Sequence, residues 1–141
     1  MSATNPILLA LDVGTVRIGV ASASTMVLLP NPLTTLSNSE TIHQEIAKLA
    51  AEQGAVAIIV GLPRNLDGDD TPQTAYVRDF VARLSQLTEL PIHLQDEALT
   101  SEKATDELDA RGKIYSKADV DALAATYILE DYVRDHGGDV S

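Results

Sequence analysis

The chain has 141 residues, enough for one domain with its own hydrophobic core, so we expect a single domain over residues 1–141 whose ends, 1–6 and 136–141, are flexible tails. Ten basic residues against 21 acidic ones give a net charge of −11, which argues against nucleic-acid binding over a broad basic surface. The sequence has no cysteine, which excludes disulfides, thiolate catalysis and zinc–thiolate sites. No secretion signal and no apolar stretch of membrane-spanning length is recognisable, so we expect a cytoplasmic protein.

Three strands are predicted at the start of the chain. Residues 7–11 form a continuous apolar run, which is typical of a strand covered on both faces. Gly14-Thr15 indicates a turn, and the alternating residues 17–24 predict a returning strand. Residues 26–36 predict a third strand, which its two prolines confine to a sheet edge. Together the three strands predict an antiparallel meander.

Helices and strands alternate after this meander. The spacing of apolar residues predicts a helix that begins at a Ser39 cap and ends at Gly54. A buried strand over 55–62 follows, then a loop, then a helix capped by Thr71 with Pro72 in its first turn. The remaining predicted elements are a strand over 90–97 and helices over about 100–111 and from Ser116 to before Gly137. Because strand–helix–strand order favours parallel pairing, we expect an α/β fold with a mixed five-stranded sheet, the meander followed by parallel strands, flanked by helices.

Acidic residues stand at the ends of several predicted elements. They are Asp12 after the first strand, Asp96 and Glu97 after the last strand, and Asp119 and Asp121 early in the last helix. Each alone has an ordinary explanation as a turn residue, a solvated strand end or a partner of the helix dipole. Asp119 lies three residues after Ser116 and also matches a capping box, whereas Asp121 borders the apolar stripe of its helix without such an explanation.

Taken together, these acids come from three distant segments that one site could gather. Gathered carboxylates repel one another unless a cation lies between them, and Mg²⁺ or Mn²⁺ prefers such oxygen ligands. Two such ions can activate a water and stabilise the leaving oxygen of a phosphodiester. The acidic composition is therefore compatible with a metal-dependent nuclease.

Five blocks of the sequence, in order, resemble the YqgF/RuvX family. They are LDVGTVRIGVA, IIVGLPRNLDG, TPQTAYVRDFVARL, DEALTSEKA and KADVDALAATYILEDYV, and they run from about Leu8 to Val133. Proteins of this family are described as RNase H-like pre-16S rRNA nucleases or as Holliday-junction-resolvase-like proteins. The resemblance implies an RNase H-like fold and hydrolysis of phosphodiester bonds with Mg²⁺ or Mn²⁺, in 5′-end maturation of pre-16S rRNA.

The resemblance also implies which residues act. Asp12 and Asp121 match the family's acids, and the Asp96-Glu97 pair matches its Asp-Glu motif, in which Glu97 is the favoured ligand while the choice between the two stays open. The expected catalytic metal ligands are therefore Asp12, Glu97 and Asp121, with Asp96 or Asp119 possible assistants. One departure is Ala98, which stands where the family usually has an arginine after its Asp-Glu pair. A guanidinium there would contact phosphate, so its absence leaves the affinity and the rate open unless another arginine substitutes.

A local basic segment over 110–118 precedes Asp121, contains no acid, and includes an aromatic residue that can stack on a base. The cations of this segment have an equally ordinary explanation as partners of a helix C-terminus. The expected nucleic-acid contacts are Arg17, Arg64, Asn65, Arg111, Lys113, Tyr115 and Lys117.

The leading hypothesis is a nuclease of structured RNA, such as pre-16S rRNA or other ribosome-related RNA. Three alternatives remain open: a resolvase of branched DNA such as a Holliday junction, a catalytically silent RNA-binding module, and an actin-like ATP-binding phosphotransferase. The DVGT segment is also similar to the phosphate-gripping turn of the last class, which however needs two domains. The protein is expected to act as a monomer or weak homodimer without membrane contact, and apolar surface residues such as Leu129 are candidate dimer contacts.

Overall fold

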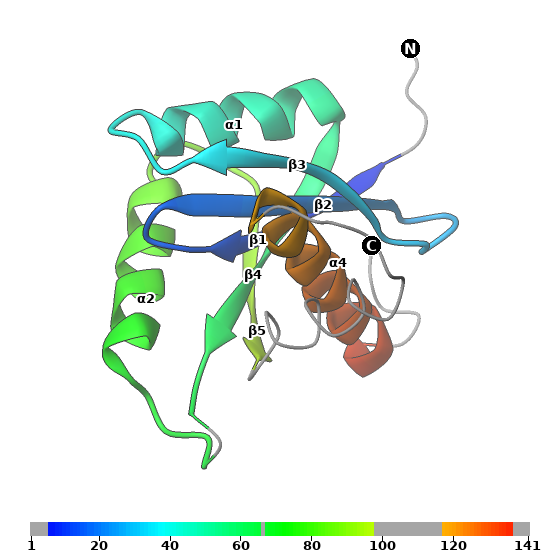
Figure 1. The fold of residues 1–141 in the computed structure, drawn as a ribbon. Helices are drawn as coiled ribbons and strands as arrows, with labels where there is room; N and C mark the ends of the chain where they lie inside the picture. The colour runs from blue at the N-terminus through cyan, green and yellow to red at the C-terminus, as the bar shows by residue number, and fades with distance from the viewer. Residues whose placement is uncertain (1–5, 66, 98–116, 137–141) are drawn as a thin grey trace.

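The computed structural model describes residues 6–65, 67–97 and 117–136 (Figure 1). Within these ranges five strands form one sheet in the order β3-β2-β1-β4-β5. The strands are β1 (Ile7–Val13), β2 (Arg17–Ser24), β3 (Asn31–Ser37), β4 (Ala55–Pro63) and β5 (Ile92–Glu97). The first three strands pair antiparallel, whereas β4 pairs parallel with both β1 and β5. The predicted mixed sheet, a meander followed by parallel strands, is confirmed.

Helices cover both faces of this sheet. The helices α1 (Ile42–Gln53) and α2 (Pro72–Leu84) pack on one face, and α4 (Lys117–His136) crosses the other, in front of the sheet in Figure 1. None of the described helices has an apolar stretch of the length that a bilayer crossing needs.

The sheet separates two hydrophobic cores because strand side chains alternate between its faces. On β1, Leu9 and Leu11 face α1 and α2, whereas Leu8 and Ala10 face α4, and all four side chains are buried. Burial of one leucine side chain contributes roughly 1.5–3 kcal/mol, so β1 is firmly held on both faces. The same alternation turns the side chain of Asp12 toward α4.

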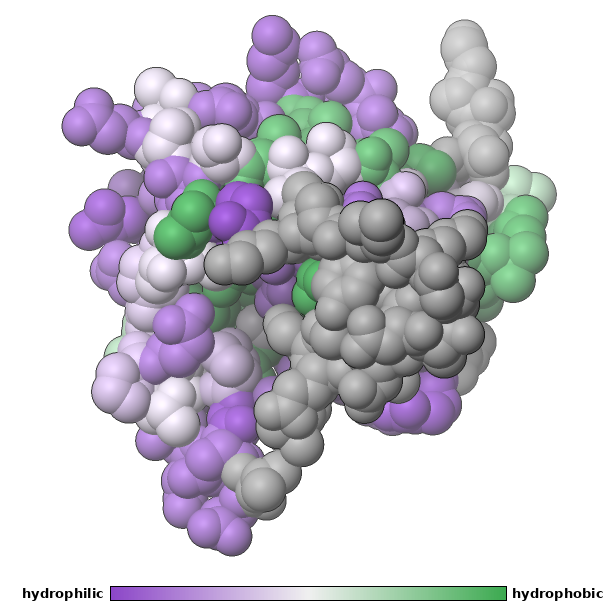
Figure 2. Space-filling model, viewed as in Figure 1, coloured by the Kyte–Doolittle hydropathy of each residue, from purple (hydrophilic) through white to green (hydrophobic). Residues whose placement is uncertain are grey.

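The third strand is shorter than predicted. It begins at Asn31 and not at residue 26, because Leu28 adopts a left-handed conformation with φ 59° and its N–H donates to the carbonyl of Ser24 at 2.8 Å. The chain therefore turns before it can pair. Met26 and Val27 project from this turn with 75% and 62% of their surfaces exposed, where Figure 2 shows apolar side chains at the right edge of the molecule.

The two helices on the α1–α2 face differ in how well their starts were predicted. Thr71 caps α2 in a capping box with Thr74, followed by Pro72, as predicted. In contrast, α1 begins after Thr41 and not after Ser39, and the Ser39 hydroxyl donates to the carboxylate of Glu45 at 2.9 Å. Gly54 ends α1 with φ 72°, as predicted. The predicted helix over about 100–111 lies outside the described residues.

The last helix packs its middle tightly against the sheet. It spans the predicted range, and Ala125, Ile128 and Leu129 are buried against β1, β2 and β4. The expectation that Leu129 is an apolar surface residue available to a dimer is wrong, because the helix turns this side chain into the core.

Candidate active site

The centre of the candidate site is Asp12, near the C-terminal end of the central strand β1. Its side chain points to the α4 face and is half-buried. Burial, together with the negative charge of Asp121, raises the pKa of Asp12 to about 7. The carboxylate form of Asp12 is therefore costly in this environment unless a positive charge is supplied.

Two features of the chain bring Asp121 to this carboxylate. Gly19 on β2 lies directly opposite Asp12 in the β1–β2 register. A Cβ atom at Gly19 would lie 1.9 Å from the carbonyl oxygen of Asp121 and 2.9 Å from the amide nitrogen of Ala122. Because a side chain at position 19 has no room, only glycine lets the backbone of α4 approach β2 here. Gly19 was not singled out from the sequence, although a glycine inside a predicted strand is the signal of such a close approach.

Arg17, at the start of β2, is the second feature. Its Nε donates to Oδ2 of Asp121 at 2.7 Å, and the two side chains are 32% and 20% exposed. In this arrangement Arg17 supplies the positive charge beside Asp121, whereas Asp12 forms no ion pair within the described residues. Arg17, a predicted nucleic-acid contact, therefore lies beside the pair of acids Asp12 and Asp121.

The sheet register distinguishes Glu97 from Asp96. Glu97 pairs with Pro63 and Gln95 pairs with Gly61, and Gln95 donates from Nε2 to Oδ2 of Asp135 on α4 at 2.8 Å. Glu97, two residues further along β5, shares this face with Gln95 and hence with Asp12. A Cβ atom at Gly61 would lie 3.7 Å from Cγ of Glu97, so the Glu97 side chain runs beside β4 on the α4 face.

Asp96 lies on the opposite face. Its Oδ1 accepts a hydrogen bond from Nε of Arg64 at 3.0 Å, and the Arg64 guanidinium also binds Asp70 at 2.7 Å. Asn65 Oδ1 accepts from the backbone N–H groups of Asp67 and Asp69 at 3.0 and 2.8 Å. Arg64 and Asn65, both predicted nucleic-acid contacts, therefore organise the polar loop between β4 and α2 (Figure 2, bottom).

Of the remaining predicted site residues, two lie at the start of α4 and three lie outside the described residues. Asp119 is exposed in the first turn of α4, and Lys117 is the first residue of that helix. Arg111, Lys113 and Tyr115 lie outside the described residues. Their roles stay predictions.

Asn38 holds the turn that carries the site and was missed by the sequence analysis. Its Nδ2 donates to the carbonyl of Gly14 at 2.8 Å and to the hydroxyl of Tyr76 at 2.7 Å, and its backbone N–H donates to the carbonyl of Val16 at 2.9 Å. Because Asp12 precedes this turn and Arg17 follows it, Asn38 fixes the chain between two residues of the candidate site. No local sequence signal marks an asparagine that acts across the fold in this way.

The carboxylates of the candidate site are ligands of the type that divalent cations prefer, but those described are not arranged to hold one as they stand. In the three described ranges no group of three or more His, Cys, Asp or Glu side chains is arranged to hold a metal ion as it stands. Asp12 and Asp121 nevertheless repel one another strongly enough to affect the pKa of Asp12, and Glu97 lies on the same face. A hard cation such as Mg²⁺ or Mn²⁺ prefers oxygen ligands and would neutralise the repulsion between these carboxylates. The donor atoms of the three residues therefore fit a divalent cation.

Comparison with known proteins gives concordant matches. Residues 6–135 match the model of the RuvX family, described as Holliday junction resolvase. A protein of Thiobacillus denitrificans named "Putative pre-16S rRNA nuclease" is 40% identical over 134 residues, covering 92% of both chains. A protein of Chloroflexus aggregans with the same name is 39% identical over 132 residues, covering 89% of this chain and 92% of its own.

A solved structure, T. thermophilus RuvC in complex with Holliday junction substrate, superposes with a TM-score of 0.55. It covers 94% of this chain and 96% of its own at 15% sequence identity, so the likeness concerns the fold. The predicted RNase H-like fold is confirmed.

Proposed function

Because this chain belongs to the RuvX family, we propose that it is a nuclease that hydrolyses phosphodiester bonds of structured RNA in the cytoplasm, with pre-16S rRNA as its substrate. The observation that carries the proposal is the position of Asp12 beside Asp121, with Glu97 on the same face of the sheet. The names of the curated relatives support the RNA substrate.

In this proposal Asp12, Glu97 and Asp121 hold Mg²⁺ or Mn²⁺. A divalent cation supplies, when bound, activation of a water for attack on phosphorus and stabilisation of the leaving oxygen. Asp12 would hold the cation in its carboxylate form, and the raised pKa of Asp12 makes the fraction of that form depend on pH near neutrality. In this proposal Asp96 is not a metal ligand, because it lies on the other face of the sheet and is hydrogen-bonded to Arg64.

Arg17 has a second role in the proposal. Ala98 stands where the family usually has an arginine. Arg17, which lies beside Asp121, supplies a guanidinium in its place. On release from Asp121, a guanidinium at this place can bind a phosphate oxygen pair of the substrate. The acidic protein thereby gains a local contact for a polyanion despite its net charge of −11.

The test is cleavage of a 5′-extended 16S rRNA precursor fragment by purified protein with Mg²⁺, with Mn²⁺ and with EDTA. We expect cleavage with either metal and none with EDTA, and Asp12→Asn and Glu97→Gln should lower the rate by about 100-fold or more. Asp96→Asn is the matched control and should cleave as the parent does. Undiminished cleavage by Asp12→Asn would rule the mechanism out.

Branched DNA is the second candidate substrate. The description of the RuvX family and the RuvC fold neighbour favour it, and the same carboxylates would serve. A four-way DNA junction in the same assay separates the two substrates, because the preferred one is cleaved at the lower protein concentration.

A further inference from the structure

The strand that carries Glu97 lies at the edge of the sheet. β5 is the last strand in the sheet order, so within the described ranges it is paired on one side only, by β4. Glu97 is the last residue of β5. The end of a strand opens locally at a lower free energy than the middle of a sheet, because fewer contacts hold it. The direction of the Glu97 side chain therefore depends on the contacts that hold this end of β5.

One residue in the loop after β4 contacts both residues at this end of β5. The backbone N–H of Arg64 donates to the carbonyl of Glu97 at 3.1 Å. The Arg64 side chain reaches Asp96, whose Oδ1 accepts from Nε at 3.0 Å. Asp96 and Glu97 point to opposite faces of the sheet, because successive side chains of a strand alternate. Arg64 thus binds the backbone of one residue and, on the face away from α4, the side chain of the other.

The guanidinium of Arg64 is also bound to the start of α2. Its Nη1 donates to Oδ1 of Asp70 at 2.7 Å and to the carbonyl of Gly68 at 3.3 Å. Asp70 lies 3.7 Å from a guanidinium nitrogen of Arg78 on α2, and the next residue, Thr71, caps this helix in its capping box. Arg64 therefore ties the end of an edge strand to a helix start that capping and an ion pair hold in place.

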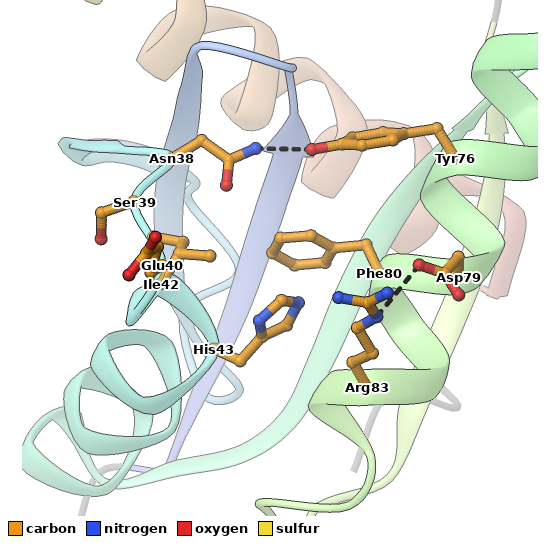
Figure 3. A pocket seen from close by; sticks show the side chains of 9 residues that line it. All are labelled: Asn38, Ser39, Glu40, Ile42, His43, Tyr76, Asp79, Phe80 and Arg83. Atoms are coloured by element: carbon orange, nitrogen blue, oxygen red, sulfur yellow. Dashed lines mark hydrogen bonds and ion pairs between the residues drawn. The ribbon is translucent and has the colours of Figure 1, made fainter.

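The number and direction of these contacts require an arginine. A guanidinium carries its donors in a rigid plane, so Nε and Nη1 can bind two carboxylates at once, whereas the ammonium of a lysine is a single point charge. Only 26% of the Arg64 side chain is exposed. Arg83 on α2 is the natural comparison, because it pairs with one acid, Asp79, at 3.1 Å, and 67% of its side chain is exposed (Figure 3). An exposed pair of this kind contributes little to stability.

We propose that Arg64 is the positioning residue of Glu97: it holds the end of β5 so that the Glu97 carboxylate stays on the face of Asp12 and Asp121. The part that Glu97 plays there rests on the proposed function. The sequence predicts another role for Arg64, a contact to nucleic acid. The two roles differ in their kinetics, because loss of a phosphate contact weakens substrate binding, whereas loss of a positioning residue slows the reaction of the bound substrate.

The first experiment measures cleavage of the 5′-extended 16S rRNA precursor fragment by Arg64→Ala, with Arg83→Ala as the matched control. We expect Arg64→Ala to lower kcat about 10-fold with KM unchanged, the smaller of the losses found when a group that orients a metal ligand is removed. Arg83→Ala should keep both constants of the parent. A raised KM with unchanged kcat would overturn the inference in favour of a phosphate contact, and equal losses in the two variants would overturn it in favour of general destabilisation.

Variants of Asp96 test the side-chain contact. Asp96→Asn keeps an oxygen that accepts from Nε of Arg64 and should keep the kcat of the parent. Asp96→Ala removes the acceptor and should lower kcat toward that of Arg64→Ala. Because the two residues act through one contact, the double variant should be no slower than Arg64→Ala alone. Losses that add in the double variant would overturn the inference.

The second experiment needs neither metal nor RNA. Hydrogen exchange at the backbone N–H of position 64 reports whether the end of β5 stays closed, because this N–H donates to the carbonyl of Glu97. The N–H of Ile58, which donates to the carbonyl of Pro91 at 3.0 Å just before β5, is the internal control. In Arg64→Ala and in Asp96→Ala we expect protection at position 64 to fall about five-fold, the change that corresponds to one hydrogen bond, and protection at Ile58 to stay unchanged.

Equal protection at position 64 in the parent and in both variants would overturn the inference. So would a loss of the same size at Ile58, since the whole strand pair would then have loosened. The exchange measurement does not depend on cleavage. A local loss at position 64 in a protein whose parent cuts no RNA would therefore support the positioning role and refute the nuclease proposal alone.

Discussion

Replacement of Asp12 by asparagine should stabilise the metal-free protein, although it removes a residue that we place at the heart of catalysis. The carboxyl of Asp12 is held half-buried beside Asp121, and Arg17 pairs with Asp121. Burial first, and the charge of Asp121 second, raise the pKa of Asp12 from 3.8 to about 7. Ionised Asp12 therefore lowers the free energy of unfolding, and the neutral asparagine of the variant does not.

The sign and size of the effect follow from linkage. Between pH 3.8 and about 7 the folded chain keeps the proton of Asp12 while the unfolded chain loses it. The folded state binds more protons over this window, so the free energy of unfolding falls as the pH rises through it. A shift of about three units at 1.36 kcal/mol per unit corresponds to a loss of up to about 4 kcal/mol above pH 7.

The assay is urea unfolding of the parent and of Asp12→Asn in EDTA, followed by circular dichroism between about pH 4 and pH 8. We expect the stability difference in favour of the variant to be smallest near pH 4, to grow through the window and to level off above pH 7. Asp96→Asn, at the same end of the sheet on the other face, is the control and should show no such growth. A difference for Asp12→Asn that does not change with pH would refute the reasoning.

Three further predictions address the residues around Asp12. Gly19→Ala should destabilise the fold by about 1–3 kcal/mol in urea and lower the cleavage rate, because its Cβ meets the α4 backbone 1.9 Å away; parent-like stability would contradict this. Tyr76→Phe removes the hydroxyl that accepts from Asn38 and should lower kcat about two- to ten-fold in cleavage kinetics with little change in KM, whereas a change in KM alone would argue against a positioning role. Arg17→Gln should tighten Mn²⁺ binding in calorimetry, since the competing charge leaves Asp121, and weaker binding would show that Arg17 does not compete.

The secondary structure was predictable wherever local chemistry decides it. The apolar run of β1 and the alternation of β2 arise from burial on two faces, and the Thr71–Pro72 start of α2 arises from capping within one turn. The start of β3 was missed because the left-handed Leu28 is not a residue that sequence rules place at positive φ. The start of α1 was missed because serine ranks above threonine as an N-cap, which favours Ser39, whereas the helix begins after Thr41.

The candidate site was predictable in its residues but not in its geometry. The family blocks indicate Asp12, Glu97 and Asp121, yet the sequence left Asp96 and Glu97 undecided. Only the β4–β5 register, which pairs Glu97 with Pro63, decides which of the two shares the face of Asp12. A shift by one residue would exchange them, and such a register depends on the packing of the whole sheet.

Contacts between distant segments were beyond the sequence altogether. The ion pair of Arg17 with Asp121 spans 104 residues, and the hydrogen bond of Asn38 to Gly14 spans 24. Neither has a local pattern, and the close approach of α4 depends on glycines on two strands. The predicted basic contacts over 111–115 lie outside the described residues and stay predictions.

Mn²⁺ binding, measured by calorimetry at pH 8, tests most directly that Asp12, Glu97 and Asp121 form one cation site. We expect Asp12→Asn, Glu97→Gln and Asp121→Asn each to weaken the affinity at least about 10-fold, the loss that removal of even a supporting group causes at metal sites. Asp96→Asn should bind Mn²⁺ as the parent does. Parent-like affinity in the three variants, or an equal loss in Asp96→Asn, would contradict the account.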